Sequence, residues 1–77
     1  MTENQRHLLR SLRLRRRQLG LKQREIASLS GYTESQINRW ENAREFPRGS
    51  ALLDWCEALG VRLTVHVVRH IERPKAA

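Results

Sequence analysis

Four polar residues between positions 34 and 39 are spaced so that their side chains could read the edges of base pairs. Glu34 and Asn38 lie four residues apart, and so do Ser35 and Arg39. On a helix, residues four apart lie along the same edge. An arginine there could donate to O6 and N7 of guanine, and a glutamate could accept from N4 of cytosine while repelling phosphate. The alternative interpretation is an ordinary polar helix surface.

Positive charge gathers in the N-terminal part of the chain and points to a polyanion as the partner. Lys and Arg number 15 against 8 Asp and Glu, which gives a formal net charge of +7. Residues 6–24 hold eight basic residues and no acidic one. A solvated helix face is one explanation. Protein surfaces usually mix both signs, however, so a stretch of one sign this long favours contact with phosphate.

Few residues indicate catalysis, metal binding or a disulfide framework. The chain has one cysteine, Cys56, which we expect to be a small buried apolar residue. His66 and His70 lie in a segment with a strand pattern, where four residues span ~13 Å, too far to share one ion. We find no Ser/His/Asp set, no suitable pair of carboxylates and no phosphate loop. We therefore expect no enzymatic activity, no metal site and no cofactor.

Length and hydropathy predict one small domain. The chain has 77 residues, of which 39% are hydrophobic, enough for a modest core. No apolar run approaches the ~20 residues of a transmembrane helix, and no apolar stretch follows a charged start as in a signal peptide. We expect a cytoplasmic protein without a membrane partner.

Cap and turn residues divide residues 1–60 into four expected helices, which must position the polar residues. Thr2 with Gln5, and Thr33 with Gln36, predict capping boxes at the start of the first and third helices. The second helix is expected to begin near residue 22 and the fourth at residue 49 or 50. The apolar residues expected on the helices are Leu8, Leu12, Leu19, Ile26, Ala27, Leu29, Ile37, Trp40, Leu52, Leu53, Trp55, Cys56 and Leu59. Tyr32 and Phe46 could cover this core or contact a nucleic-acid backbone.

Arg16 interrupts the apolar pattern of the first helix. It stands four residues after Leu12, on the stripe where a leucine would be expected. A guanidinium buried there needs an acidic partner. The sequence therefore predicts a buried ion pair that involves Arg16.

After residue 60 the pattern changes to a period of two, which predicts a half-buried strand over residues 61–70 and a flexible tail over residues 71–77. It is the only strand that the sequence predicts, and an unpaired strand exposes its N–H and C=O groups. Symmetric pairing with a second copy would satisfy these groups and predicts a homodimer. The expected interface residues are Val61, Leu63, Val65 and Val67.

Three residues at fixed offsets indicate that the second and third helices form a helix-turn-helix. Such a motif needs a small residue where the helices cross, a glycine in the turn and a branched apolar residue facing the small one; Ala27, Gly31 and Ile37 stand at these offsets. Residues 19–61, LGLKQREIASLSGYTESQINRWENAREFPRGSALLDWCEALGV, resemble the phage-repressor-like (Cro/C1, Xre) helix-turn-helix family. The family pattern is roughly L-G-L-S-Q-x-x-L-A, then G-V-S-x-x-x-I-x-x-W-E-x-G, then a proline and a helix ending A-L-G-V. The resemblance implies a mainly α, four-helix, lambda-repressor-like DNA-binding domain over residues 1–60, here followed by a dimerisation strand as in some antitoxins.

The resemblance also implies individual roles. Glu41 matches a glutamate that pairs with the arginine corresponding to Arg16. Gln23 matches a glutamine that contacts a phosphate and braces the third helix. Base contacts are expected from Glu34, Ser35, Asn38 and Arg39. Contacts to the DNA backbone are expected from Lys22, Gln23, Thr33, Arg44 and Arg48.

Three residues depart from the family pattern. Lys22 stands where an N-cap Ser or Thr is usual, so the second helix lacks its own cap and a DNA phosphate could supply the acceptor. Ala43 replaces the usual glycine after the third helix. Ser30 replaces a leucine, for which Leu29 could compensate.

Together these observations predict a transcriptional regulator, a repressor that binds a palindromic operator in double-stranded DNA as a homodimer. The alternative is an antitoxin that represses its own operon and neutralises a toxin protein, because relatives that end in a single C-terminal strand include antitoxins. A cationic module on a membrane surface is disfavoured, because the first helix has no Trp, Phe or Tyr and its leucines are needed by the core. The expected location is the cytoplasm, at the nucleoid when DNA is bound.

Overall fold

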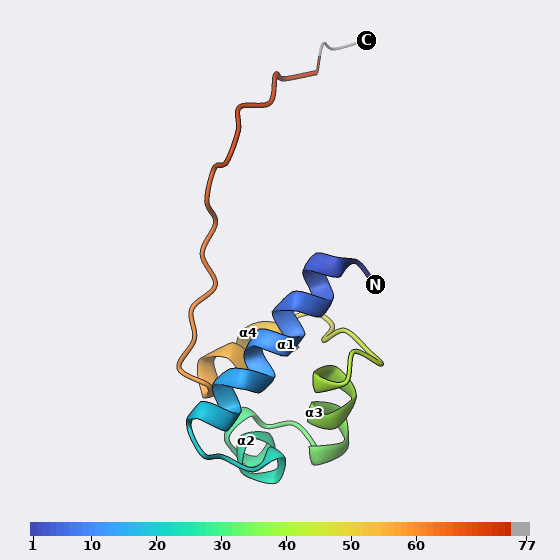
Figure 1. Cartoon of the computed structure of the whole chain (residues 1–77), viewed down its shortest axis with the longest axis vertical. Coiled ribbons are helices and arrows are strands. Elements are labelled where there is room, and N and C mark those ends of the chain that lie inside the picture. Colours follow the sequence, from blue (N-terminus) through green and yellow to red (C-terminus); the bar gives the residue numbers. More distant parts are fainter. Residues whose placement is uncertain (75–77) are drawn as a thin grey trace.

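The computed structural model describes residues 1–74 and shows four helices followed by an extended C-terminal segment (Figure 1). The helices are α1 (Glu3–Gln18), α2 (Gln23–Ser30), α3 (Glu34–Glu41) and α4 (Ala51–Ala58). The predicted mainly α fold with four helices is therefore confirmed. Of the predicted flexible tail, residues 75–77 lie outside the described residues.

α1 begins at the predicted capping box. The Gln5 N–H donates to Thr2 Oγ1 over 3.1 Å, and the Thr2 N–H donates to Gln5 Oε1 over 2.7 Å. These two bonds satisfy N–H groups that the helix itself leaves unpaired. The threonine and glutamine at this spacing therefore fix where α1 starts.

The core contains one leucine that the sequence analysis left out and lacks three that it included. Leu9 on α1 is fully buried. Leu19, Leu29 and Leu53 are exposed instead, Leu19 because α1 has ended at the preceding residue. Since Leu29 is 66% exposed, the expectation that it compensates for Ser30 is wrong.

α2 and α3 form the helix-turn-helix, and the three residues at the predicted offsets have the expected surroundings. Ala27 and Ile37 are buried, and Gly31 has a φ of 82°, in the left-handed region that favours glycine. The N–H groups of Gly31 and Tyr32 both donate to the Ala27 carbonyl and end α2. α2 packs against α3 and α4, while α1 packs against α3.

Two tryptophans occupy the core, as predicted. Trp40 and Trp55 are buried with ring centroids 5.3 Å apart, and Tyr32 lies edge-on to Trp40 at 5.2 Å. The Tyr32 hydroxyl donates to Asp54 Oδ2 over 2.6 Å, and this hydrogen bond raises the pKa of Tyr32. Tyr32 and Phe46 both pack against the core, which decides between the two roles left open for them.

The C-terminal segment, residues 61–74, runs away from the helices as an extended chain (Figure 1). Val61 packs against the helical core, and its N–H donates to the Cys56 carbonyl. Val61 therefore belongs to the packed helical part rather than to the exposed set of predicted interface residues. Val65 and Val67 are 95% and 89% exposed. The predicted strand is not shown, because within residues 1–74 no other segment pairs with this one.

Ala43 follows α3 at the position where glycine is usual, and it keeps the geometry of a glycine. Its φ is 55°, in the left-handed region. The Ala43 N–H donates to the Trp40 carbonyl and the Arg44 N–H donates to the Arg39 carbonyl, the two bonds of a Schellman motif. The turn forms although a Cβ in this region is strained.

Replacing Ala43 with glycine is therefore expected to stabilise the protein. Relief of the strain, less the loss of a half-buried methyl group, should raise the free energy of unfolding by ~0.5–1 kcal/mol. For a domain of this size, that corresponds to a rise in melting temperature of roughly 4 °C. Thermal unfolding followed by circular dichroism measures it.

The matched control is the reverse change, Gly31→Ala. A Cβ built on Gly31 meets no atom within 4 Å, so backbone strain alone should lower the melting temperature. A melting temperature that is unchanged or lower in Ala43→Gly would show that the turn after α3 carries no strain.

Candidate nucleic-acid interface

α3 has one buried face and one outward face. Its capping box is formed as predicted: the Gln36 N–H donates to Thr33 Oγ1, and the Thr33 N–H donates to Gln36 Oε1. Ile37, Trp40 and Glu41 are buried. The outward face carries Glu34, Ser35, Asn38 and Arg39, of which Arg39 is half-buried and the others are exposed. The structure thus brings the four predicted base-reading residues together on one helix.

Arg39 is held at the surface by two hydrogen bonds. Its Nε donates to Glu45 Oε2 over 2.9 Å, and its Nη1 donates to Ser35 Oγ over 2.8 Å. The side chains of Arg39 and Glu45 are 42% and 38% exposed. Sequence reasoning missed Glu45, because it lies in the loop after α3 and comes beside Arg39 only through the turn at Ala43.

Arg16 finds its acidic partner in Glu41, which is the last residue of α3. Arg16 Nε donates to Glu41 Oε2 over 2.6 Å, and Arg16 Nη2 donates to Glu41 Oε1 over 2.8 Å. Arg16 Nη1 also donates to the Leu21 carbonyl over 2.7 Å. The Glu41 side chain is fully buried, and its hydrogen bonds raise the pKa of Arg16. This bidentate pair fixes α1 against the C-terminal end of α3.

Gln23 connects the buried ion pair to the outward face of α3. Its Nε2 donates to Glu41 Oε1 over 3.1 Å, and its Oε1 accepts from Asn38 Nδ2 over 3.3 Å. Gln23 is the first residue of α2, so the chain of contacts runs from α1 through Glu41 to the start of α2 and on to Asn38. The orientation of Asn38 therefore depends on Gln23 of α2 and, through Glu41, on Arg16 of α1.

The N-terminal end of α2 has no side-chain cap, as expected from lysine at the N-cap position. The Lys22 side chain makes no capping hydrogen bond, and the Lys22 N–H donates to Glu25 Oε1 over 2.9 Å. Lysine has no acceptor atom in its side chain. The first N–H groups of α2 can therefore donate to an acceptor from outside the protein, such as an anion.

A polar cleft of about 760 Å³ lies beyond the C-terminal end of α3, between the start of α1 and the loop before α4. Its basic lining residues are Arg6, Arg44 and Arg48. Arg44 and Arg48 are exposed and follow the C-terminal end of α3, where backbone contacts were expected. Sequence reasoning did not place Arg6 beside them, because 38 residues or more separate Arg6 from either one.

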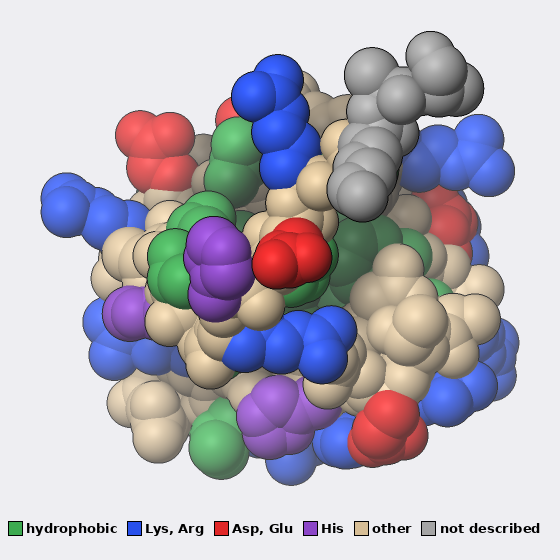
Figure 2. Space-filling model, turned by 90° about the horizontal axis from the view of Figure 1, so that it is seen from above, with side chains coloured by type: hydrophobic (Ala, Val, Ile, Leu, Met, Phe, Trp, Pro, Cys, Tyr) green, Lys and Arg blue, Asp and Glu red, His purple; other side chains and the backbone are tan. Residues whose placement is uncertain are grey.

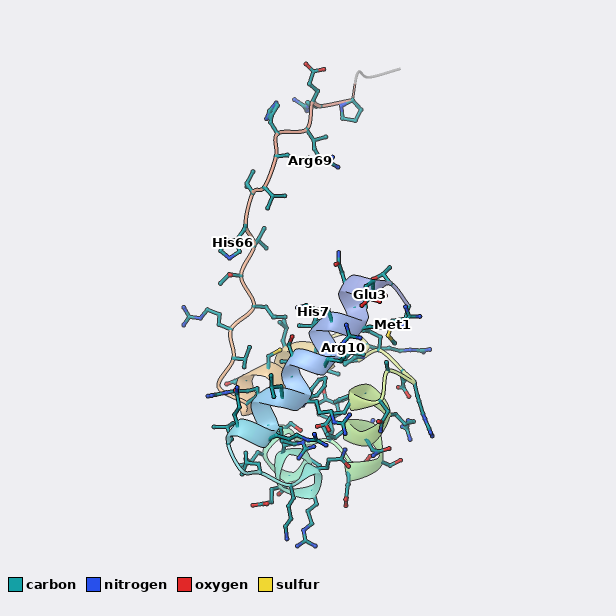
Figure 3. All side chains as sticks on the ribbon, viewed as in Figure 1. Met1, Glu3, His7, Arg10, His66 and Arg69 are labelled. Carbon is teal, nitrogen blue, oxygen red and sulfur yellow. The ribbon has the colours of Figure 1, made fainter. Side chains whose placement is uncertain are left out.

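Basic side chains project around much of the outline of the molecule when it is viewed from above (Figure 2). One of these basic residues, Arg10, forms an ion pair within α1: its Nη2 lies 2.9 Å from Glu3 Oε1 (Figure 3). The hydrogen bond and the positive charge of Arg10 lower the pKa of Glu3. His66 and Arg69 lie far from α1 on the C-terminal segment (Figure 3). Two arginines of α1 lie close to the end of α3: Arg16, in its ion pair with Glu41, and Arg13, whose Nε is 3.9 Å from Glu41 Oε1.

Residues 1–74 do not meet the requirements of a metal site, a reactive cysteine or a membrane-spanning helix. No group of His, Cys, Asp and Glu in this part of the chain could hold a metal ion. Cys56 is buried, and burial raises the pKa of its thiol, which keeps it protonated and unreactive. None of the helices described is both long enough and apolar enough to cross a membrane.

A family model described as a helix-turn-helix domain matches residues 7–70. The match begins within α1, includes α2, α3 and α4, and continues along most of the C-terminal segment. No curated protein and no solved structure matches the chain.

Proposed function

Because the chain belongs to the helix-turn-helix domain family, we propose that it is a transcriptional regulator that reads specific sequences with α3 in the major groove of double-stranded DNA. The observation that supports this proposal is the polar outward face of α3, which lies beside the uncapped start of α2 and is followed by the exposed Arg44 and Arg48. The residues assigned to bases are Glu34, Ser35, Asn38 and Arg39. The residues assigned to the DNA backbone are Lys22, Gln23, Thr33, Arg44 and Arg48.

The regulator in this proposal is a repressor of the phage-repressor-like (Cro/C1, Xre) type that acts as a homodimer on a palindromic operator. Residues 1–60 bind DNA and residues 61–70 pair with a second copy. Two observations support the dimer: the exposed apolar side chains of the C-terminal segment, and the inclusion of this segment in the family match. Neither catalysis nor a cofactor has a part in this function.

Selection of bound sequences from random duplex DNA tests the proposal. The expected result is one enriched palindromic sequence, with half-site centres ~34 Å or 10–10.5 base pairs apart. Enrichment of a single half-site would contradict the dimer but not the reading of bases by α3. No enrichment of any sequence would contradict the proposed function itself.

Affinity for the selected operator is expected to fall steeply with salt. If a dimer neutralises about eight phosphates, the logarithm of the association constant should fall against the logarithm of salt concentration with a slope near −7. Binding isotherms at several salt concentrations between about 50 and 200 mM measure the slope. A slope shallower than about −2 would contradict the assignment of the basic residues to phosphate.

One observation favours a second candidate, an antitoxin that also neutralises a toxin protein. Val65, Val67, Val68 and Ile71 are exposed on an extended segment that could pair with a strand of another protein. A full-length protein that stays monomeric in solution, yet forms a stable complex with the product of a neighbouring reading frame, would favour this candidate over the homodimer.

A further inference from the structure

The contacts of Arg39 with Ser35 and Glu45 carry an inference that rests on the proposed function and concerns its specificity. Ser35 lies one turn before Arg39 on the same edge of α3, and Glu45 approaches from the loop after the helix. The guanidinium is thus bonded from two sides before any DNA is present. Two of its five N–H groups are used, which leaves the others available to an acceptor.

The backbone turn after α3 places Glu45 where it can make this contact. Ala43 takes the left-handed conformation, and the Arg44 N–H returns to the Arg39 carbonyl over 2.9 Å. This turn brings Arg44 back to the backbone of Arg39, and the next residue, Glu45, reaches the Arg39 side chain. Both side chains remain partly exposed, so the ion pair itself adds little to stability.

The Arg39–Glu45 pair changes how strongly Arg39 is attracted to two different acceptors, backbone phosphate and guanine. A solitary arginine on the outward face of α3 would bind any phosphate that it meets, because that attraction is independent of sequence. With Glu45 bonded to Nε, a phosphate that approaches Arg39 also approaches a carboxylate of the same sign. The O6 and N7 atoms of guanine are neutral acceptors and do not meet this repulsion to the same degree.

We propose that Glu45 is a specificity-determining residue, which orients Arg39 toward a guanine edge and weakens the attraction of Arg39 to DNA backbone phosphate. Glu45 acts through Arg39 and is a positioning residue for it. Removing the carboxylate should therefore strengthen binding to unrelated DNA more than binding to the operator.

The test compares Glu45→Gln with Glu57→Gln, which removes the same charge from α4, at a position that is exposed and has no assigned role in DNA binding. Dissociation constants are measured for the selected operator and for a random duplex at one salt concentration. For Glu45→Gln, we expect random-duplex binding about 3–10-fold tighter and a ratio of operator to random affinity that falls by about 10-fold. For Glu57→Gln, both affinities should rise together and leave the ratio unchanged.

A second comparison shows whether the effect passes through Arg39. Arg39→Ala should lower the ratio of affinities, and adding Glu45→Gln to Arg39→Ala should then change the ratio no further. An unchanged ratio in Glu45→Gln, or a parallel loss of both affinities, would overturn the inference while leaving operator binding intact. If the unaltered protein shows no preference for any duplex, the proposed function fails and this inference fails with it.

Discussion

Replacing Glu41 with alanine is expected to lower the free energy of unfolding by ~3–5 kcal/mol, a large share of the ~5–15 kcal/mol of a typical domain. Glu41 accepts two hydrogen bonds from Arg16 and one from Gln23, and its side chain is fully buried. Its loss leaves the nearly buried Arg16 guanidinium without an anion. A guanidinium cannot shed its charge in a protein, so the penalty cannot be avoided by deprotonation. Urea unfolding followed by the fluorescence of the buried Trp40 and Trp55 measures it.

Two control variants distinguish the cost of leaving a buried charge unpaired from the cost of losing side-chain contacts. Arg16→Met should destabilise less than Glu41→Ala, because Glu41 keeps the hydrogen bond from Gln23 and still has the Arg13 guanidinium 3.9 Å away. The double variant Arg16→Met with Glu41→Leu removes both charges from the core. It should approach the stability of the unaltered protein, since apolar residues often replace a buried pair without loss. Equal and small shifts for Glu41→Ala and Arg16→Met would contradict the importance of the pair.

Local sequence signals predicted the helix boundaries and the turn between α2 and α3. A threonine followed three residues later by glutamine acts within one turn of helix, and both such boxes form at Thr2 and Thr33. Gly31 ends α2 for a reason that is equally local, because its φ is positive. The apolar periodicity likewise placed Trp40 and Trp55 in the core. These features depend on neighbours in the sequence, so a single sequence was enough to predict them.

Features that depend on contacts between distant segments were not predictable in the same way. The apolar periodicity of α2 could not predict that Leu29 would be exposed, because burial depends on which other elements pack against that face of the helix. The same holds for Glu45 beside Arg39 and for Arg6 in the cleft with Arg44, which follow from the course of the chain after α3. The predicted C-terminal strand is a further case, because within residues 1–74 no other segment lies beside residues 61–70 to pair with them.

Removing the C-terminal segment is expected to cause the largest loss of function. Truncation after Arg62 keeps Val61, which packs against the helical core, and removes Leu63, Val65 and Val67. If two copies pair through these residues, the truncated protein should keep its helices but become a monomer. Each half-site must then be bound separately, and affinity for the palindromic operator should fall by about 10²–10⁴-fold. Sedimentation at micromolar concentration and band shifts on the selected operator measure the two effects.

A pair of single substitutions shows whether the apolar face of the segment is responsible. Val65→Lys places two like charges near the two-fold axis of an antiparallel pair and should dissociate the dimer. Val68→Lys adds the same charge to an equally exposed residue on the opposite face of the segment, where it meets solvent, and should leave the dimer intact. Dissociation by both lysines alike would mean that charge on the segment, not its apolar face, controls association. A full-length protein that sediments as a monomer, or a truncated one that remains a dimer, would contradict pairing of two copies through this segment. Its exposed apolar side chains would then favour a different protein partner.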